Sequence, residues 1–171
     1  MTDKAANMLR YVLISFSLLA FAFVNAQNTY ESQELRVGFK SADGFNVVLD
    51  DVESWDLASN DERFFVSVTL RINEDLKREY LEEETYWNGV DLFFGDGLTN
   101  TEVTCLEIDS FDVCYVIGNI EFGIYGFNLI GLMMKKEMTD GQHLQVAISF
   151  NEGDRKGAAE ILKHFYSKTD Q

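Results

Sequence analysis

The stretch Phe64–Ile72, FFVSVTLRI, decides the fold that the sequence predicts. Apolar side chains occupy every second position from Phe64 to Ile72, and most positions between them are polar. Successive side chains of a β-strand point to opposite faces, so a period of two predicts a strand with one buried face. No other stretch of the chain alternates as cleanly, and we expect a central strand here.

Shorter stretches on both sides also predict β-structure. A half-buried strand is expected around Val37, and residues 43–44, Asp-Gly, predict a turn that leads into 45–52 as a hairpin. Further strands are expected at 90–94 and 144–150. The first two thirds of the chain after residue 26 are therefore expected to be mostly β.

Two stretches in the last third predict helices. Residues 127–138, FNLIGLMMKKEM, contain good helix formers and carry Lys135 and Lys136 in their last turn. Residues 157–168 place Ala158, Ile161, Leu162 and Phe165 at helical spacing. We expect a mainly β, antiparallel β-sandwich-like domain with one or two short helices in the C-terminal third, with an α+β domain as the alternative.

The two cysteines fit opposite positions of one hairpin. A turn at Asp109 and Ser110 would pair residue 108 with 111 and Cys105 with Cys114. Directly opposed residues in an antiparallel pair lie close enough for a disulfide. The spacing is not Cys-x-x-Cys and no Lys, Arg or His lies nearby to activate a thiol. We therefore predict a structural Cys105–Cys114 disulfide and no redox site.

Residues 1–26 resemble a cleaved secretory signal peptide. Lys4 and Arg10 precede the uncharged apolar run 11–24, and Ala26 ends a short cleavage signal before Gln27. An uncleaved membrane anchor is the alternative. We expect residues 27–171 to form a single β-rich globular domain that is not stably inserted in a membrane after cleavage. The absence of any N-glycosylation sequence fits a bacterial periplasmic or cell-envelope protein of a Gram-negative organism.

The charge of the chain argues against nucleic acid as a partner. The full chain has 29 acidic and 14 basic residues, for a net charge of −15. Removal of Asp3, Lys4 and Arg10 with the leader leaves 28 acidic and 12 basic residues, for a net charge of −16. Proteins that bind nucleic acid neutralise phosphates with Lys and Arg. A protein partner with basic or apolar patches fits this charge better.

The sequence contains no motif for a catalytic, cofactor or metal site. His143 and His164 are its only histidines, stand in no metal-binding spacing, and are both expected at the surface. Acidic residues gather in three clusters, which we interpret as solvated faces because none follows a calcium-loop pattern. The clusters are Asp50, Asp51, Glu53 and Asp56; Glu82, Glu83 and Glu84; and Asp109 with Asp112.

Five aromatic residues stand beside charged ones rather than inside a clean strand pattern. Such residues either anchor an interface or pack at the edge of a core. They are Tyr30, Trp55, Tyr80, Tyr86 and Trp87.

Part of the chain resembles the invasion-associated locus B family of exported bacterial proteins. The resemblance rests on an ordered series of short segments between Gly89 and Gly153, and on Trp55-Asp56-Leu57 before it. Where the family commonly has a cysteine after the tryptophan strand, this chain has Ser59. The resemblance implies a β-rich envelope protein without a known catalytic site. The segments are Gly89-Val90-Asp91-Leu92, Asp96-Gly97, Thr104-Cys105, Cys114, Leu129-Ile130, Met134-Lys135-Lys136 and Leu144-Gln145-Val146.

These observations leave two hypotheses from different classes. The first is a non-enzymatic interaction or accessory protein of the envelope with an unknown protein partner. The alternative is a carrier of a small hydrophobic ligand, which the abundance of Phe suggests and which requires a cavity of about 300 Å³ or more. An enzyme would need His143 or His164 in a cleft with a carboxylate and a serine.

Overall fold

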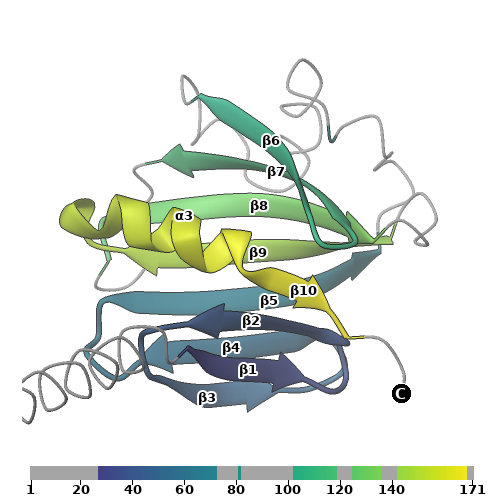
Figure 1. Cartoon of the computed structure of the whole chain (residues 1–171), viewed down its shortest axis with the longest axis horizontal. Coiled ribbons are helices and arrows are strands. Elements are labelled where there is room, and N and C mark those ends of the chain that lie inside the picture. Colours follow the sequence, from purple (N-terminus) through teal and green to yellow (C-terminus); the bar gives the residue numbers. More distant parts are fainter. Residues whose placement is uncertain (1–26, 73–80, 82–101, 119–124, 136–141, 169–171) are drawn as a thin grey trace, which may run out of the picture.

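Two antiparallel sheets and one helix make up the part of the chain that the computed structural model describes, residues 27–72, 81, 102–118, 125–135 and 142–168 (Figure 1). The mainly β, sandwich-like fold predicted from the sequence is confirmed. The leader predicted at 1–26 and the strand predicted at 90–94 lie outside the described residues.

The larger sheet has seven strands, and the alternating stretch Phe64–Ile72 is one of its interior strands. This strand, β5, pairs with one neighbour on each side, so the prediction of a central strand is confirmed. In spatial order the strands are β3 (Phe45–Asp50), β4 (Ser54–Ser59), β5 (Phe64–Ile72), β9 (Gln142–Phe150), β8 (Phe127–Lys135), β7 (Phe111–Gly118) and β6 (Val103–Ile108).

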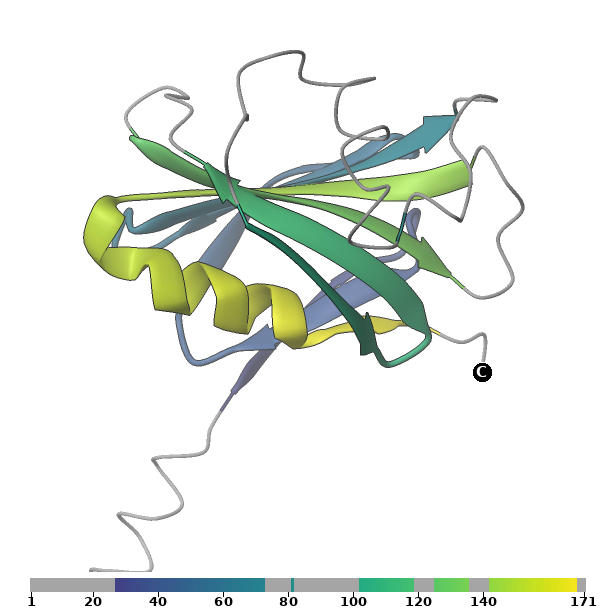
Figure 2. The same ribbon diagram turned by 90° about the horizontal axis from the view of Figure 1, so that it is seen from above.

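A second layer covers one face of this sheet. It consists of helix α3 (Arg155–Lys163) and a sheet of three strands in the order β1 (Asn28–Ser32), β2 (Val37–Ser41) and β10 (Phe165–Ser167). A short 3₁₀ turn, η3 (Glu152–Asp154), leads from β9 into α3. In Figure 1, α3 lies in front of β8 and β9, with the small sheet beside it in front of β4 and β5. Figure 2, seen from above, shows α3 on one side of the large sheet. We call the covered face the inner face and the opposite one the outer face.

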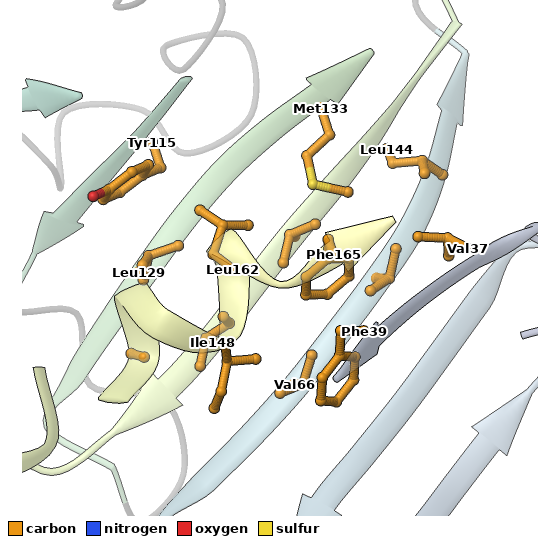
Figure 3. Packing of buried hydrophobic residues seen from close by; sticks show 14 of the residues in the cluster. Val37, Phe39, Val66, Tyr115, Leu129, Met133, Leu144, Ile148, Leu162 and Phe165 are labelled. Atoms are coloured by element: carbon orange, nitrogen blue, oxygen red, sulfur yellow. The ribbon is translucent and has the colours of Figure 1, made fainter. Parts of the chain in front are cut away.

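The hydrophobic core fills the space between the two layers (Figure 3). Alternate residues of β5, among them Phe64, Val66 and Val68, are fully buried there. A side chain at Gly157 of α3 would come within 2.6 Å of the Phe64 ring, so glycine lets the helix lie directly on the sheet. The largest fully buried side chains are Trp55, Phe39, Phe64, Phe111, Phe150, Phe165, Leu57, Leu129 and Leu132.

Strands β6 and β7 form the predicted cysteine hairpin in the predicted register. Ile108 lies opposite Phe111, and Cys105 lies opposite Cys114 with their Cα atoms 4.1 Å apart. The two cysteines are joined by a disulfide, which confirms the pairing. Asp109 begins the tight turn with a φ of 52°, a left-handed conformation that Asp adopts more readily than most residues.

The helix predicted at 127–138 is wrong, because residues 127–135 form strand β8. From Asn128 to Lys135 every residue of this strand is buried, on both faces of the sheet. Leu129 and Met133 belong to the core between the layers, whereas Ile130 and Leu132 point to the outer face. A strand buried on both faces loses its polar alternation and cannot be told from a buried helix by periodicity.

Two other expectations also need correction. Residues 43–44 do not connect a hairpin, because β2 pairs with β1 and β10 in the small sheet whereas β3 pairs with β4 in the large one. The chain instead changes sheets at this turn. The second predicted helix is present but ends at Lys163, and Phe165–Ser167 continues as strand β10, which places Phe165 in the core.

Candidate functional site

A hollow of about 450 Å³ lies on the outer face of the large sheet, over strands β4, β5, β9 and β8. Its position follows from the pleat, because residues that alternate with the buried core positions point outward. We call it the sheet hollow. It is lined by Asp56, Phe65, Ser67, Thr69, Arg71, Asn128, Ile130, Gln145, Ala147 and Ser149.

The sheet register explains why this part of the outer face is hollow. Ser67 lies opposite Ala147, and Ala147 lies opposite Ile130, so two small side chains occupy the middle of one row. Phe65 and Gln145 are larger and stand in the rows on either side. Small side chains surrounded by larger ones leave a depression in a sheet whose backbone is otherwise continuous.

Hydrogen bonds between neighbouring strands fix several polar side chains of the hollow. The Ser67 hydroxyl donates to Oδ1 of Asp56 at 2.6 Å, and the Ser149 hydroxyl donates to Oδ1 of Asn128 at 2.5 Å. Ser149 and Asn128 are buried, and this bond satisfies polar groups that would otherwise destabilise the sheet. The floor of the hollow is therefore held in one arrangement by the strands and by these bonds.

A second surface lies on strand β3 and the turn that follows it, at one edge of the large sheet as the described residues form it. Its valine and leucine side chains are 41–64% exposed, which is unusual for a run of large apolar residues. A bulge between Val47 and Leu49 interrupts the regular pairing of β3 with β4. We call this surface the apolar–acidic edge. It consists of Val47, Val48, Leu49 and Val52 together with the exposed acidic residues Asp50, Asp51 and Glu53.

Hydrogen bonds hold two carboxylates of this edge, those of Asp50 and Asp51. Oδ1 of Asp51 accepts the backbone N–H groups of Glu53 and Ser54, at 2.9 and 2.7 Å, and so shapes the turn between β3 and β4. Oδ1 of Asp50 accepts from the Ser32 hydroxyl at 2.6 Å, which joins this edge to the small sheet. Of the acidic cluster predicted here, Asp50, Asp51 and Glu53 thus lie at the end of β3 and in the turn after it, whereas Asp56 lies on β4 and lines the sheet hollow.

The two histidines lie in different places. His143 is fully buried on β9, so its predicted surface position is wrong. His143 alternates with core residues and therefore points to the outer face, opposite Arg71. The prediction failed because the outer face is covered at this position, and His143 is buried there. His164 directly follows α3, and its Nδ1 lies 2.7 Å from the carbonyl oxygen of Glu160.

A smaller hollow, of about 160 Å³, includes His164 together with Ser41, Asp43 and Glu160. These residue types could form a catalytic triad, but their contacts do not have that geometry. The Ser41 hydroxyl oxygen accepts the N–H of Asp43, and Nδ1 of His164 contacts a backbone carbonyl instead of a carboxylate. The Glu160 carboxylate forms an ion pair with Lys163 at 3.0 Å.

Arg63 connects three loops through three carboxylates. Its guanidinium lies 2.6 Å from both Asp43 and Asp61 and 3.2 Å from Asp154. The hydrogen bond from Arg63 lowers the pKa of Asp61 to about 2, and the Ser59 hydroxyl contributes. The carboxylates in turn raise the pKa of Arg63. This cluster ties the turn between β2 and β3 to the β4–β5 turn and to the start of α3.

The remaining predicted site residues are scattered. Trp55 is fully buried in the core, and Tyr30 packs against Phe39 and Phe45 while its hydroxyl accepts the N–H of Phe45. Asp109 Oδ2 accepts the N–H of Ser167 at 2.9 Å. The other predicted aromatic and acidic residues, namely Tyr80, Tyr86, Trp87, Glu82, Glu83 and Glu84, lie outside the described residues.

Two other kinds of site, a metal site and a membrane-spanning helix, are absent from the described ranges. No group of three or more His, Cys, Asp or Glu side chains is arranged there to hold a metal ion. Likewise, no helix in the described part of the chain has the length and apolar character needed to span a membrane.

Comparison with known proteins gives a fold but no family. No family model matches the chain, and no curated protein matches it. Among solved structures, cyanobacterial PsbP (CyanoP) from Synechocystis sp. PCC 6803 aligns with a TM-score of 0.53 and 12% identity, over 83% of this chain and 92% of CyanoP. The chain therefore shares the fold of CyanoP.

Two further structures align over the same share of this chain, each with a TM-score of 0.49 and 10% identity. One is the Ran-binding protein Mog1p of Saccharomyces cerevisiae, of which 95% is covered. The other is a protein of Bacteroides thetaiotaomicron VPI-5482, of which this chain spans about half, 48%.

Neither candidate surface could be located from the sequence. Residues of the sheet hollow come from strands up to 93 positions apart, Asp56 to Ser149, and gather only through the order of strands. The Val47-Val48-Leu49 run belongs to the segment 45–52, which the sequence predicts as one strand of a hairpin with the strand around Val37. Its place at a sheet edge follows from the switch of sheets between β2 and β3.

Proposed function

We propose that this chain is an exported, non-enzymatic interaction protein of the bacterial periplasm or cell envelope, and that a partner protein docks on the apolar–acidic edge. One observation carries the proposal: Val47, Val48 and Val52 expose more than half of their surface directly beside a group of carboxylates. Exposed apolar residues rimmed by charge are typical of protein-binding sites.

Charge complementarity indicates the kind of partner. Asp50, Asp51 and Glu53 border the apolar side chains, and the whole chain has a net charge of −15. A partner with an apolar patch surrounded by Lys or Arg would bury the valines and face the carboxylates, which favours fast and specific association. A second copy of this chain would bring the same negative charge and fits less well.

The disulfide and the predicted leader support export. Disulfides persist in oxidising compartments such as the periplasm, and Cys105 and Cys114 are joined. Mass spectrometry of the protein produced in a Gram-negative host should find Gln27 as the first residue and a mass two hydrogens below that of the reduced chain. A retained leader or free thiols would contradict this part of the proposal.

Crosslinking in envelope extracts tests the docking surface. Wild-type protein should crosslink to a basic partner, and Val48→Lys should abolish that crosslink because it adds positive charge at the centre of the surface. Gln33→Lys, at an exposed position of the β1–β2 turn outside this edge, is the matched control and should retain it. Equal crosslinking by all three proteins would reject the apolar–acidic edge as the docking surface.

A small-ligand carrier is the second candidate, and the volume of the sheet hollow favours it. Its 450 Å³ exceeds the 300 Å³ that a small-molecule site requires. Seven of its described lining residues are polar or charged, but most of the surface that the lining exposes to the hollow is apolar, so the lining suits a ligand with both apolar and polar parts.

A further inference from the structure

The sheet hollow has a charge distribution that the proposed docking function does not use. Among the lining residues that the structure describes, Asp56 and Arg71 are the charged ones. Asp56 lies on β4 at one side of the hollow, and Arg71 lies near the end of β5. Within the described lining, one negative group and one positive group thus lie at two separate points of the hollow.

The spacing of these two charges can be estimated from the sheet register. Asp56 lies directly opposite Ser67, and Arg71 is four residues further along β5. At a rise of about 3.3 Å per residue, four residues correspond to roughly 13 Å. An extended peptide of four residues spans about the same length between its ends.

The chemistry of the two charged groups favours a ligand with opposite charges at its ends. Ser67 donates to Oδ1 of Asp56, which leaves Oδ2 of this half-buried carboxylate to accept from an ammonium group. Arg71 is exposed, and a guanidinium can bind a carboxylate through two parallel hydrogen bonds.

The middle of the hollow suits a short main chain with small side chains. Ala147 and Ser67 leave room above the sheet, and Phe65 offers a half-buried aromatic surface at one side. The hydroxyl of Thr69 and the amide of Gln145, which lie opposite each other, could donate to or accept from peptide groups.

We propose that the sheet hollow binds a short, extended zwitterionic peptide of about four small residues, with its N-terminal ammonium at Asp56 and its C-terminal carboxylate at Arg71. The inference is independent of docking at the apolar–acidic edge, because none of the lining residues belongs to that edge.

Titration with unblocked tetra-alanine, followed by NMR of the ¹⁵N-labelled full mature protein, tests the proposal. We expect shifts of residues on β4, β5, β8 and β9 that saturate at millimolar peptide or below. The N-acetylated and the C-amidated forms of the same peptide are the matched probes, and each should bind at least fivefold more weakly. Equal binding of the capped and uncapped forms, or no saturable shifts, would overturn the proposal.

Charge-neutral variants assign each end of the peptide. Asp56→Asn retains an acceptor for Ser67. It should lower the affinity for the uncapped peptide about as much as N-acetylation lowers the affinity of the wild type. Acetylation of the peptide should then lower the affinity of this variant little further. Arg71→Gln should lower the affinity for the uncapped peptide about as much as C-amidation does, and C-amidation should lower the affinity of this variant little further. Glu34→Gln and Arg155→Gln, at exposed positions outside the hollow, should bind like the wild type.

A variant that fills the hollow with a larger side chain distinguishes binding in the hollow from non-specific binding to surface charges. Ala147→Leu should abolish binding without a change of charge, and an unchanged circular dichroism spectrum should accompany it. Undiminished binding by Ala147→Leu would place the peptide elsewhere and reject the site. Crosslinking to a partner protein should be unaffected by Ala147→Leu, so failure of this inference can be told from failure of the proposed docking function.

Discussion

The two faces of the seven-stranded sheet use the same strands for different purposes. On the inner face, Val66 of β5 and Ile148 of β9 lie opposite each other and are fully buried under the second layer. One residue further along each strand, Ser67 and Ala147 lie opposite each other on the outer face and line the hollow. Alternate residues of one strand therefore pack in the core and line the hollow. Substitutions on one face of the sheet should leave the structure of the other face largely unchanged.

The largest effect is expected on the inner face. Ile148→Ala should lower the free energy of unfolding by about 2–5 kcal/mol, because it removes buried methyl groups from a filled core. Ala147→Ser, at the adjacent residue on the outer face, is the control and should change it by less than about 1 kcal/mol. Urea denaturation of both variants measures the difference. Similar losses for the two would contradict the division between the faces.

A smaller effect is expected from the disulfide, which joins β6 to β7 on the outer side of their hairpin. The bond closes a short loop, with a sequence separation of 9. For about ten residues the loop entropy gives roughly 2.7 kcal/mol, so replacing both cysteines by alanine should cost no more than this. The double variant should still unfold in one transition in urea. Complete loss of folding would show that the outer face contributes to stability as strongly as the core.

The Arg63 cluster should contribute less than about 1 kcal/mol, because its side chain is 43% exposed and that of Asp61 is 49% exposed. The pKa of Asp61 is lowered from 3.8 to about 2 in the folded protein, so its ionised form favours folding above pH 3.8. That contribution is lost as the pH falls from about 4 towards 2. Arg63→Gln should therefore lower stability at pH 7 and flatten the pH dependence in this window, as thermal denaturation can measure. If the stability of Arg63→Gln depended on pH between about 4 and 2 as steeply as that of the wild type, Arg63 would not be the cause of the lowered pKa of Asp61.

The smallest effect is expected for Thr69→Ala on the outer face of β5. Thr69 is half-buried and lines the hollow instead of packing in the core. The free energy of unfolding should therefore change by no more than about 0.5 kcal/mol. Val68→Ala, at the neighbouring buried position, is the matched comparison and should be clearly less stable in the same urea experiment.

The same division explains what could be predicted from the sequence. Strand β5 was recognised because one of its faces is apolar and the other more polar, and the cysteine hairpin was placed in register because a two-residue turn fixes it. Strand β8 was missed because both of its faces are buried. The alternation of polar and apolar residues indicates which face of a strand is exposed to solvent, and it gives no signal for a strand that is buried on both faces.

The candidate surfaces depend on neighbours that local patterns do not specify. The hollow requires β9 to lie between β5 and β8, and β9 is separated from β5 by about 70 residues of sequence. The apolar–acidic edge requires β3 to be the last strand of its sheet. Alternation within a strand predicted which residues share a face, but it could not predict which strands lie side by side.

The small sheet has a consequence for the time at which the protein can finish folding. Its middle strand, β2, pairs on one side with β1 and on the other with β10, near the opposite end of the chain. Lys168 and Tyr166 reach back to the same carboxylate, that of Glu31, each at 2.8 Å. A chain that emerges N-terminus first, from a ribosome or a translocation channel, must therefore keep Val37 and Phe39 without their final cover until residues 165–167 arrive. This delay between synthesis and closure gives chaperones a window in which to hold the polypeptide unfolded.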